Sequence, residues 1–214
     1  RMVRHVSEVV SKRFGKSILE LGGNNCIIVD ETADMKLVVP AVVFGSVGTA
    51  GQRCTSTRRI IVHSSIFKDF IELLIDAYKQ VKIGDPLEEN TLMGPLVNQG
   101  AVSDFLAAIK KAKDLGGEVI FGGARYAEGT NYVLPTIIKA KNHWSIVQEE
   151  TFAPILYIMT YKTLDEAIQM HNNVPQGLSS AMFTQSVKNS ELFLSSVGSD
   201  CGIANINIGT SGAE

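Results

Sequence analysis

The sequence has few cysteines, little net charge and no long apolar run. Its three cysteines, Cys26, Cys54 and Cys201, are too few and too scattered for a disulfide framework or a cysteine-based zinc site. The formal net charge is −2, so the chain has no excess of positive charge that would attract nucleic acid or an anionic membrane. No stretch approaches the roughly 18 apolar residues of a membrane span. We therefore expect a globular chain of a reducing compartment, cytoplasmic or mitochondrial, without nucleic-acid or membrane partners and without a metal site.

Helix-like and strand-like spacings of apolar residues alternate along the chain. The strand-like runs are residues 18–21, 27–29, 59–63, 119–121, 155–161, 179–183 and 203–208. Helix-like runs are expected at residues 2–14, 34–47, 65–81, 102–109, 163–168 and 190–197. Strands separated by helices need crossover connections, so the pattern predicts an α/β fold, a layered and mostly parallel sheet with covering helices.

Small polar residues mark several of the expected helix starts. Asp34 and Ser65 precede apolar runs and can accept hydrogen bonds from the first turn of a helix. Thr163 and Glu166 have the spacing of a capping box. Pro40 would either begin or kink the helix that follows Asp34.

Cys54 lies on an expected loop between a helix-like run and the strand at 59–63. Small residues crowd the segment before it, which lets the backbone approach a ligand closely. The neighbouring Arg53 and nearby backbone N–H groups would favour a reactive thiolate. The alternative is that Cys54 is a small buried apolar residue without a chemical role.

Two acidic positions invite a functional interpretation as well. Glu20 lies in an apolar run that ends at Gly22, and it is either an outward-facing strand residue or a functional acid with a tuned pKa. Glu150 precedes Phe152 and Pro154. This second segment is either a solvated turn or a carboxylate that binds a sugar diol beside an aromatic ring.

Taken together, these segments resemble the aldehyde dehydrogenase family along the whole chain. Residues 19–24 are similar to the family's glutamate motif and residues 51–54 to its cysteine motif, and the separation of 34 positions between Glu20 and Cys54 is the usual one. Residues 150–154 are similar to its cofactor-binding Glu-x-Phe-x-Pro element, and 132–136 to another family segment. Small departures occur at Cys26, Ser56 and Gly209.

The resemblance implies a complete chemical scheme. Cys54, as a thiolate, would attack the aldehyde, its backbone N–H would stabilise the oxyanion, and Glu20 would be the general base. NAD, or NADP, would accept a hydride. Glu150 would bind the nicotinamide ribose, Phe152 would pack near the nicotinamide, and Gly22 would line the cofactor site.

Within the family, the similarity narrows towards enzymes that act on α-aminoadipic semialdehyde. It is carried by residues 20–25, 47–55, 151–157, 176–180 and 198–214. Arg53 would face the charged end of such a substrate, and Ser211, Gly212 and Ala213 would offer donors to its carboxylate. For residues 211–213 a plain turn is the alternative.

The ends of the chain favour an internal part of a longer protein, because it begins inside a helix-like run. The resemblance implies that residues 1–21 end a coenzyme-binding domain, that residues 22–214 are a catalytic domain truncated at its C-terminus, and that the full-length form is a homodimer or homotetramer.

Other functions stay open at this point. The chain could belong to a dehydrogenase that acts on another semialdehyde or on an aliphatic aldehyde. It could also be a folded module with no activity of its own. A cysteine protease or acyltransferase is disfavoured, because no histidine has a plausible place beside Cys54. The four histidines, at positions 5, 63, 143 and 171, are expected on the surface or at helix caps rather than as metal ligands.

Overall fold

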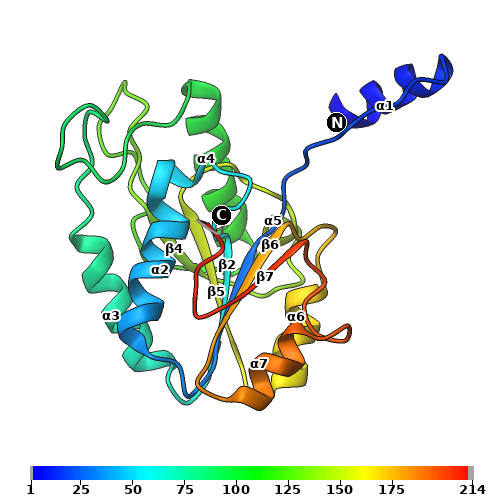
Figure 1. The fold of residues 1–214 in the computed structure, drawn as a ribbon. Coiled ribbons are helices and arrows are strands. Elements are labelled where there is room, and N and C mark those ends of the chain that lie inside the picture. Colours follow the sequence, from blue (N-terminus) through cyan, green and yellow to red (C-terminus); the bar gives the residue numbers. More distant parts are fainter. Residues whose placement is uncertain (1, 212–214) are drawn as a thin grey trace.

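A seven-stranded sheet organises the computed structural model, which describes residues 2–211 (Figure 1). The strand order is β3-β4-β5-β2-β1-β6-β7, and every pairing is parallel except the antiparallel pair of β3 with β4. The strands are β1 (Cys26–Val29), β2 (Arg59–His63), β3 (Glu118–Phe121), β4 (Thr136–Lys139), β5 (Ile155–Tyr161), β6 (Ser179–Phe183) and β7 (Ile203–Ile206). The expected α/β fold with a mostly parallel sheet is confirmed.

Helices cover both faces of this sheet. The described helices are α1 (Met2–Lys12), which stands away from the sheet, and α2 (Met35–Val47), α3 (Phe67–Lys79), α4 (Gln99–Asp114), α5 (Ser145–Gln148), α6 (Leu164–Asn172) and α7 (Val187–Leu194). Figure 1 shows α2 and α3 on one side of the sheet and α6 and α7 on the other. None of the described helices combines the length and the apolar content that crossing a membrane requires.

The central strands form the core because both of their faces are covered. Ile27 and Ile28 of β1 and Ile60 and Ile61 of β2 are fully buried. Parallel strands buried on both faces have continuous apolar runs rather than an alternating pattern, as these do. At about 25 cal/mol per Å² of buried apolar area, such residues supply most of the stabilisation of the domain.

The parallel register brings four loops to one edge of the sheet. Asn24 precedes β1 and donates its backbone N–H to the carbonyl of Gln176, which precedes β6. Arg58 precedes β2, and its carbonyl accepts a hydrogen bond from Tyr157 of β5. Since the amino ends of parallel strands meet at the same edge, the loops that carry Cys54 and Glu150 lie next to each other there.

Several local predictions are confirmed and several are wrong. Asp34 caps α2 by accepting a hydrogen bond from Lys36, and Thr163 caps α6 by accepting one from Glu166. Ser65 caps nothing, because its hydroxyl contacts the Nδ1 atom of His63 at 2.7 Å and α3 begins only at Phe67.

The largest error concerns the strand expected at residues 18–21. Residues 15–25 have no regular secondary structure, and Ile18 is 96 % exposed. An apolar run forms a strand only where a neighbouring strand pairs with it, and no described strand pairs with this one. Figure 1 shows α1 standing away from the sheet at the end of this segment.

Candidate active site

The loop that carries Cys54 has an unusual backbone. It begins with a 3-10 turn, Gly48–Gly51, in which Thr49, Ala50 and Gly51 have positive φ angles of 55°, 52° and 67°. A Cβ atom on Gly51 would overlap the carbonyl group of Ala153. This close backbone approach fixes the Cys54 loop against the segment that follows Glu150.

Cys54 itself is exposed at the end of this turn, so the alternative of a buried apolar cysteine is excluded. Its carbonyl oxygen accepts a 2.7 Å hydrogen bond from the Nδ2 atom of Asn25, which also donates to the carbonyl of Ser56 at 2.8 Å. Asn25 is fully buried, and its Oδ1 atom accepts a hydrogen bond from the backbone N–H of Ser179. One buried amide therefore ties the nucleophile loop to β1 and β6.

The backbone N–H of Cys54 is left available by this arrangement. Within residues 2–211 it donates no hydrogen bond, whereas the neighbouring N–H groups of Arg53 and Ser56 donate to Ser56 Oγ and to the Arg53 carbonyl. An N–H group beside a thiol is suitably placed to stabilise an oxyanion that forms on the attacked carbon.

Arg53 is exposed next to the thiol. Its Nε atom donates to Thr49 Oγ1 at 2.8 Å, and its guanidinium lies over the ring of Phe44, 5.3 Å from the ring centroid. This contact holds the cation close to the loop surface. That Arg53 binds a substrate carboxylate stays a prediction.

Glu150, Gly22 and Phe152 come together on the other side of the loop. The Glu150 side chain is 23 % exposed, and its Oε1 atom accepts hydrogen bonds from Arg58 Nη2 at 3.1 Å and from the Gly23 N–H at 3.4 Å. A Cβ atom on Gly22 would overlap both carboxylate oxygens. Phe152 is 46 % exposed beside them.

These residues fit a nucleotide sugar. A carboxylate can accept hydrogen bonds from two ribose hydroxyls, and the missing side chain of Gly22 leaves the space that the Glu150 carboxylate occupies. Glu150 and Phe152 also line a groove of about 350 Å³ along α4. Gly22 lines a separate hollow of about 600 Å³ between α1 and the residues before β6.

Glu20 is the predicted residue that the described contacts do not bring into the site. It lies in the segment between α1 and β1, its side chain is exposed, and it makes no hydrogen bond or ion pair with residues 2–211. Gly23 and Asn24, which follow it, are buried. Its role as a general base stays a prediction.

The chain after β7 returns to the amino edge of the sheet. Ser211 is 6 % exposed, and its Oγ atom donates to the carbonyl of Thr55 at 2.9 Å. The segment therefore lies beside the nucleophile loop, as a substrate contact would require. The other two predicted substrate residues, Gly212 and Ala213, lie outside the described residues.

Two residues of this site, Asn25 and Arg58, were not predicted from the sequence. Asn25 directly follows the glutamate motif at 19–24, and neither Asn25 nor Arg58 was assigned a role. Two adjacent arginines directly before an apolar strand are an unusual signal, because buried arginines need several partners. That signal could have drawn attention to Arg58.

The prediction for His171 was wrong. This side chain is 1 % exposed, its Nε2 atom contacts Ser199 Oγ at 2.8 Å, and burial lowers its pKa to about 3. It is thus a neutral core residue and not a surface group. Within residues 2–211, no three His, Cys, Asp or Glu side chains gather at a spacing that would hold a metal ion.

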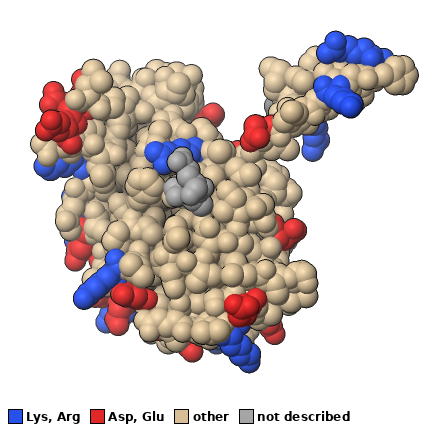
Figure 2. Space-filling view, viewed as in Figure 1, with Lys and Arg blue, Asp and Glu red and all other residues tan. Residues whose placement is uncertain are grey.

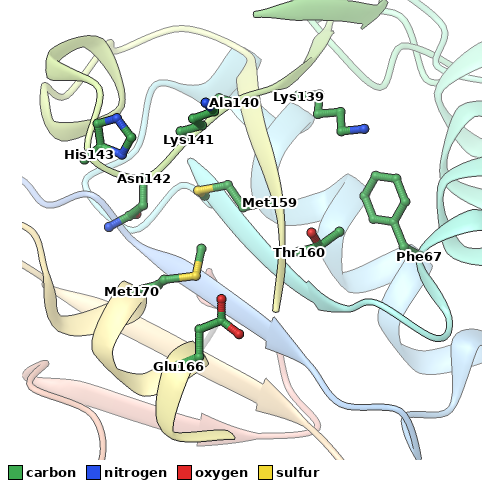
Figure 3. Close-up of a pocket in the computed structure, with 10 residues that line it drawn as sticks. All are labelled: Phe67, Lys139, Ala140, Lys141, Asn142, His143, Met159, Thr160, Glu166 and Met170. Atoms are coloured by element: carbon green, nitrogen blue, oxygen red, sulfur yellow. The ribbon is translucent and has the colours of Figure 1, made fainter. Parts of the chain in front are cut away.

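A further pocket lies apart from the candidate active site. It has a volume of about 390 Å³ and opens between the residues after β4, the last residues of β5 and α6 (Figure 3). Lys139, Lys141 and Glu166 carry its charges, and Met159 and Met170 contribute apolar surface. Because none of its lining residues belongs to the candidate active site, we assign it no part in the chemistry.

Charged side chains lie mainly towards the outline of the face shown in Figure 2. One basic patch lies nearer the middle of that face, and the surface around it is largely uncharged. The residues that matter electrostatically are therefore local ones, above all the Arg58–Glu150 ion pair.

The fold and the site together define a family. The sequence profile of the aldehyde dehydrogenase family matches residues 1–214, and the chain belongs to this family. The solved structures similar to it include lactaldehyde dehydrogenase from Escherichia coli, with a TM-score of 0.91 and 33 % identity, which covers 97 % of this chain and 44 % of that chain.

Particular relatives come still closer in sequence. Aldehyde dehydrogenase family 7 member A1 of Pisum sativum is 50 % identical over 98 % of this chain and 41 % of its own length. Alpha-aminoadipic semialdehyde dehydrogenase of Bos taurus is 50 % identical over 99 % of this chain and 39 % of its own length. A second solved structure, betaine aldehyde dehydrogenase of Staphylococcus aureus in complex with NAD+, is less similar in sequence, with 29 % identity and a TM-score of 0.91 over 97 % of this chain and 42 % of that chain. The chain thus spans about two fifths of the length of these relatives.

Proposed function

We propose that this chain is the catalytic part of an NAD(P)-dependent aldehyde dehydrogenase. The observation that carries the proposal is the Cys54 loop. An exposed thiol stands beside its own available backbone N–H, on a loop held by the buried amide of Asn25 and adjoining the Glu150 carboxylate. The nucleophile, a hydrogen-bond donor for the oxyanion and a carboxylate that can accept hydrogen bonds from a ribose therefore lie at the same edge of the sheet.

The chain's own residues account for two half-reactions. Cys54, as a thiolate, forms a bond to the aldehyde carbon, and the resulting oxyanion is stabilised by the Cys54 N–H. A bound nicotinamide would accept the hydride that leaves this carbon, which converts the thiohemiacetal to a thioester. Glu20 then removes a proton from water as the water attacks the thioester, which releases the carboxylic acid and regenerates the Cys54 thiolate.

Glu150, Phe152 and Gly22 are the residues of this chain that would bind the cofactor. The carboxylate would accept hydrogen bonds from the nicotinamide ribose, and the exposed ring of Phe152 would pack near the nicotinamide. NAD is favoured by the S. aureus relative solved in complex with NAD+. NADP stays open, because the residues named here contact the nicotinamide end only.

For the substrate we propose α-aminoadipic semialdehyde, as for the antiquitin type of aldehyde dehydrogenase. The identity of 50 % to the bovine enzyme of that name supports this choice. Arg53 would attract the charged end of the substrate, and Ser211, Gly212 and Ala213 would offer donors. Another semialdehyde or an aliphatic aldehyde is the alternative, and a panel of these substrates ranked by kcat/KM separates them.

The proposal extends to the organisation of the whole protein. Residues 1–21 would end a coenzyme-binding domain and residues 22–214 would form most of the catalytic domain. The full-length protein would be a homodimer or homotetramer, which light scattering after gel filtration measures. A reducing compartment, cytoplasmic or mitochondrial, suits its three free cysteines.

The direct test is NADH production by the full-length protein. Cys54→Ala should lower the rate by at least about 10³-fold, because no other group can form the thiohemiacetal. Cys201→Ser is the matched control and should keep most of the activity, since Cys201 lies outside the site. Full activity in Cys54→Ala would refute the proposal. The 214-residue chain, assayed alongside, shows whether it is active alone.

A further inference from the structure

Arg58 occupies a position between the two loops of the candidate active site. It directly precedes β2 and is 2 % exposed. Its Nη1 atom donates to the carbonyls of Gly51 at 3.2 Å and Thr151 at 2.9 Å. Its Nη2 atom donates to the carbonyl of Arg53 at 3.0 Å and to Glu150 Oε1 at 3.1 Å. Each Nη group therefore bonds once to the nucleophile loop and once to the Glu150 loop.

The surroundings of this guanidinium keep it charged and fixed. Phe152 stacks on it, with 5.1 Å between the Arg58 Cζ atom and the ring centroid. Burial lowers the pKa of Arg58, and the negative charges of Glu150 and of a Cys54 thiolate act in the opposite direction. Arg58 Nε is buried and has no partner among residues 2–211, so the side chain acts through its two Nη groups alone.

The adjacent arginine provides a contrast. Arg59 is fully buried, and it donates to the carbonyls of Asn24, Met170 and His171 and to the side chain of Asn142. It makes no hydrogen bond to Glu150 or to the residues on either side of Cys54. Arg59 therefore holds the fold together, whereas every side-chain hydrogen bond of Arg58 ends on one of the two functional loops.

We propose that Arg58 is a positioning residue that couples the state of the Glu150 carboxylate to the geometry of the Cys54 loop. The inference rests on the proposed function, in which Glu150 binds the cofactor ribose. Hydroxyl groups that bind Glu150 compete with Nη2 for the same carboxylate, and Nη2 also holds the Arg53 carbonyl one residue before the nucleophile. A change at Glu150 thus reaches Cys54 through one planar group. Lysine, a single point donor, cannot make the four bonds.

The test is a double-mutant cycle on the alkylation of Cys54 in the full-length protein without cofactor. The rate constant for iodoacetamide is measured across pH, with the modified peptide identified by mass spectrometry. Glu150→Gln should change this rate by about 3-fold or more in the parent protein, although Glu150 and Cys54 share no hydrogen bond. In an Arg58→Met background the same substitution should change it less than about 1.5-fold.

Two further variants keep the outcome decisive. Arg58→Lys retains the charge and replaces Arg58→Met if that variant does not fold, as judged by circular dichroism. Lys111→Met removes a cation that pairs with Glu149 at 3.0 Å on the surface beside the same loop, and it should leave the effect of Glu150→Gln unchanged.

Equal effects of Glu150→Gln with and without Arg58, or no effect in either, would overturn the inference. Because the cycle uses no cofactor and no aldehyde, its result is independent of the NADH assay. If the effects of the Glu150 and Arg58 substitutions are additive and the protein is an active dehydrogenase, only the proposed coupling is rejected. If the effects of the two substitutions depend on each other but the protein has no aldehyde dehydrogenase activity, only the proposed function is rejected.

Discussion

Residues 2–21 and residues 22–211 differ sharply in what holds them. In the first region the large apolar side chains are exposed, with Phe14 at 98 % and Ile18 at 96 %, whereas the central strands of the second are fully buried. The nucleophile belongs to the second region, where buried side chains such as Asn25 and Arg58 fix its loop. The proposed base, Glu20, belongs to the first. Contacts within residues 2–211 therefore hold the nucleophile loop, and none of them anchors Glu20.

The largest expected effect sharpens this comparison by separating the two half-reactions. Glu20→Gln in the full-length protein should lower steady-state NADH production by about 10²- to 10⁴-fold, the usual contribution of a general base. The pre-steady-state burst of NADH should persist, because Cys54 and the cofactor residues are intact. Stopped-flow absorbance measures both. Loss of the burst together with the steady-state rate would mean that Glu20 is needed before hydrolysis.

The free energy of unfolding should vary with pH because of a residue in the second region, and not because of one in the first. His171 is neutral in the folded protein with its pKa lowered to about 3 by burial, whereas an unfolded chain protonates it near pH 6.5. Its contribution is thus fully present above pH 6.5 and is lost as the pH falls towards 3, by up to roughly 5 kcal/mol. Urea denaturation should show a shallower acid slope in His171→Asn. His5→Asn, in exposed α1, is the control, and an equal change there would contradict the account.

A backbone substitution tests whether the nucleophile loop is as rigid as proposed. Gly51→Ala places a methyl group against the Ala153 carbonyl at a positive φ and should lower the free energy of unfolding by about 1–3 kcal/mol. Gly48→Ala is the matched control, because its φ is −52° and the nearest atom to a Cβ, in the Phe44 ring, is 4.0 Å away. Equal denaturation midpoints for the two variants would show that the loop moves to accommodate the added methyl group and is not rigid.

The smallest effect is expected in the first region. Ile18→Ser should change the free energy of unfolding of the chain by less than about 0.5 kcal/mol, since this side chain has almost no contacts to lose. Ile28→Val, in the middle of β1, should cost about 0.5–1.5 kcal/mol. A larger loss at Ile18 would show that the segment before β1 packs in solution.

Local patterns predicted the fold well where burial and propensity agree. The strand at 155–161 has the expected bounds, since a continuous run of β-branched and apolar residues suits a sheet covered on both faces. The strand at 179–183 also has the expected bounds, although it begins with two serines. The short β4 was missed, because Pro135 precedes it and only two of its residues are apolar. Helix α7 begins at Val187 and not at Ser190, since Ser186 provides the cap.

The site was predictable only in part. Cys54 and Glu150 stand out because their residue types and neighbours carry a chemical pattern. The contacts that position them do not, because Asn25 with Cys54 and Arg58 with Glu150 depend on which strands become neighbours in the sheet. The error at His171 has the same origin, as its burial follows from the packing of α6 on the sheet and not from its own segment.

The most direct test of the central claim is to identify the atom that carries the acyl group. Glu20→Gln, in the full-length protein, is mixed with α-aminoadipic semialdehyde and NAD+, quenched in acid within the burst, digested and analysed by mass spectrometry. We expect the added mass of the acyl group on the peptide that contains Cys54, sensitive to hydroxylamine as a thioester is. An acyl group on the peptide of Cys26 or Cys201, or NADH formed with no acyl group on Cys54, would contradict the account.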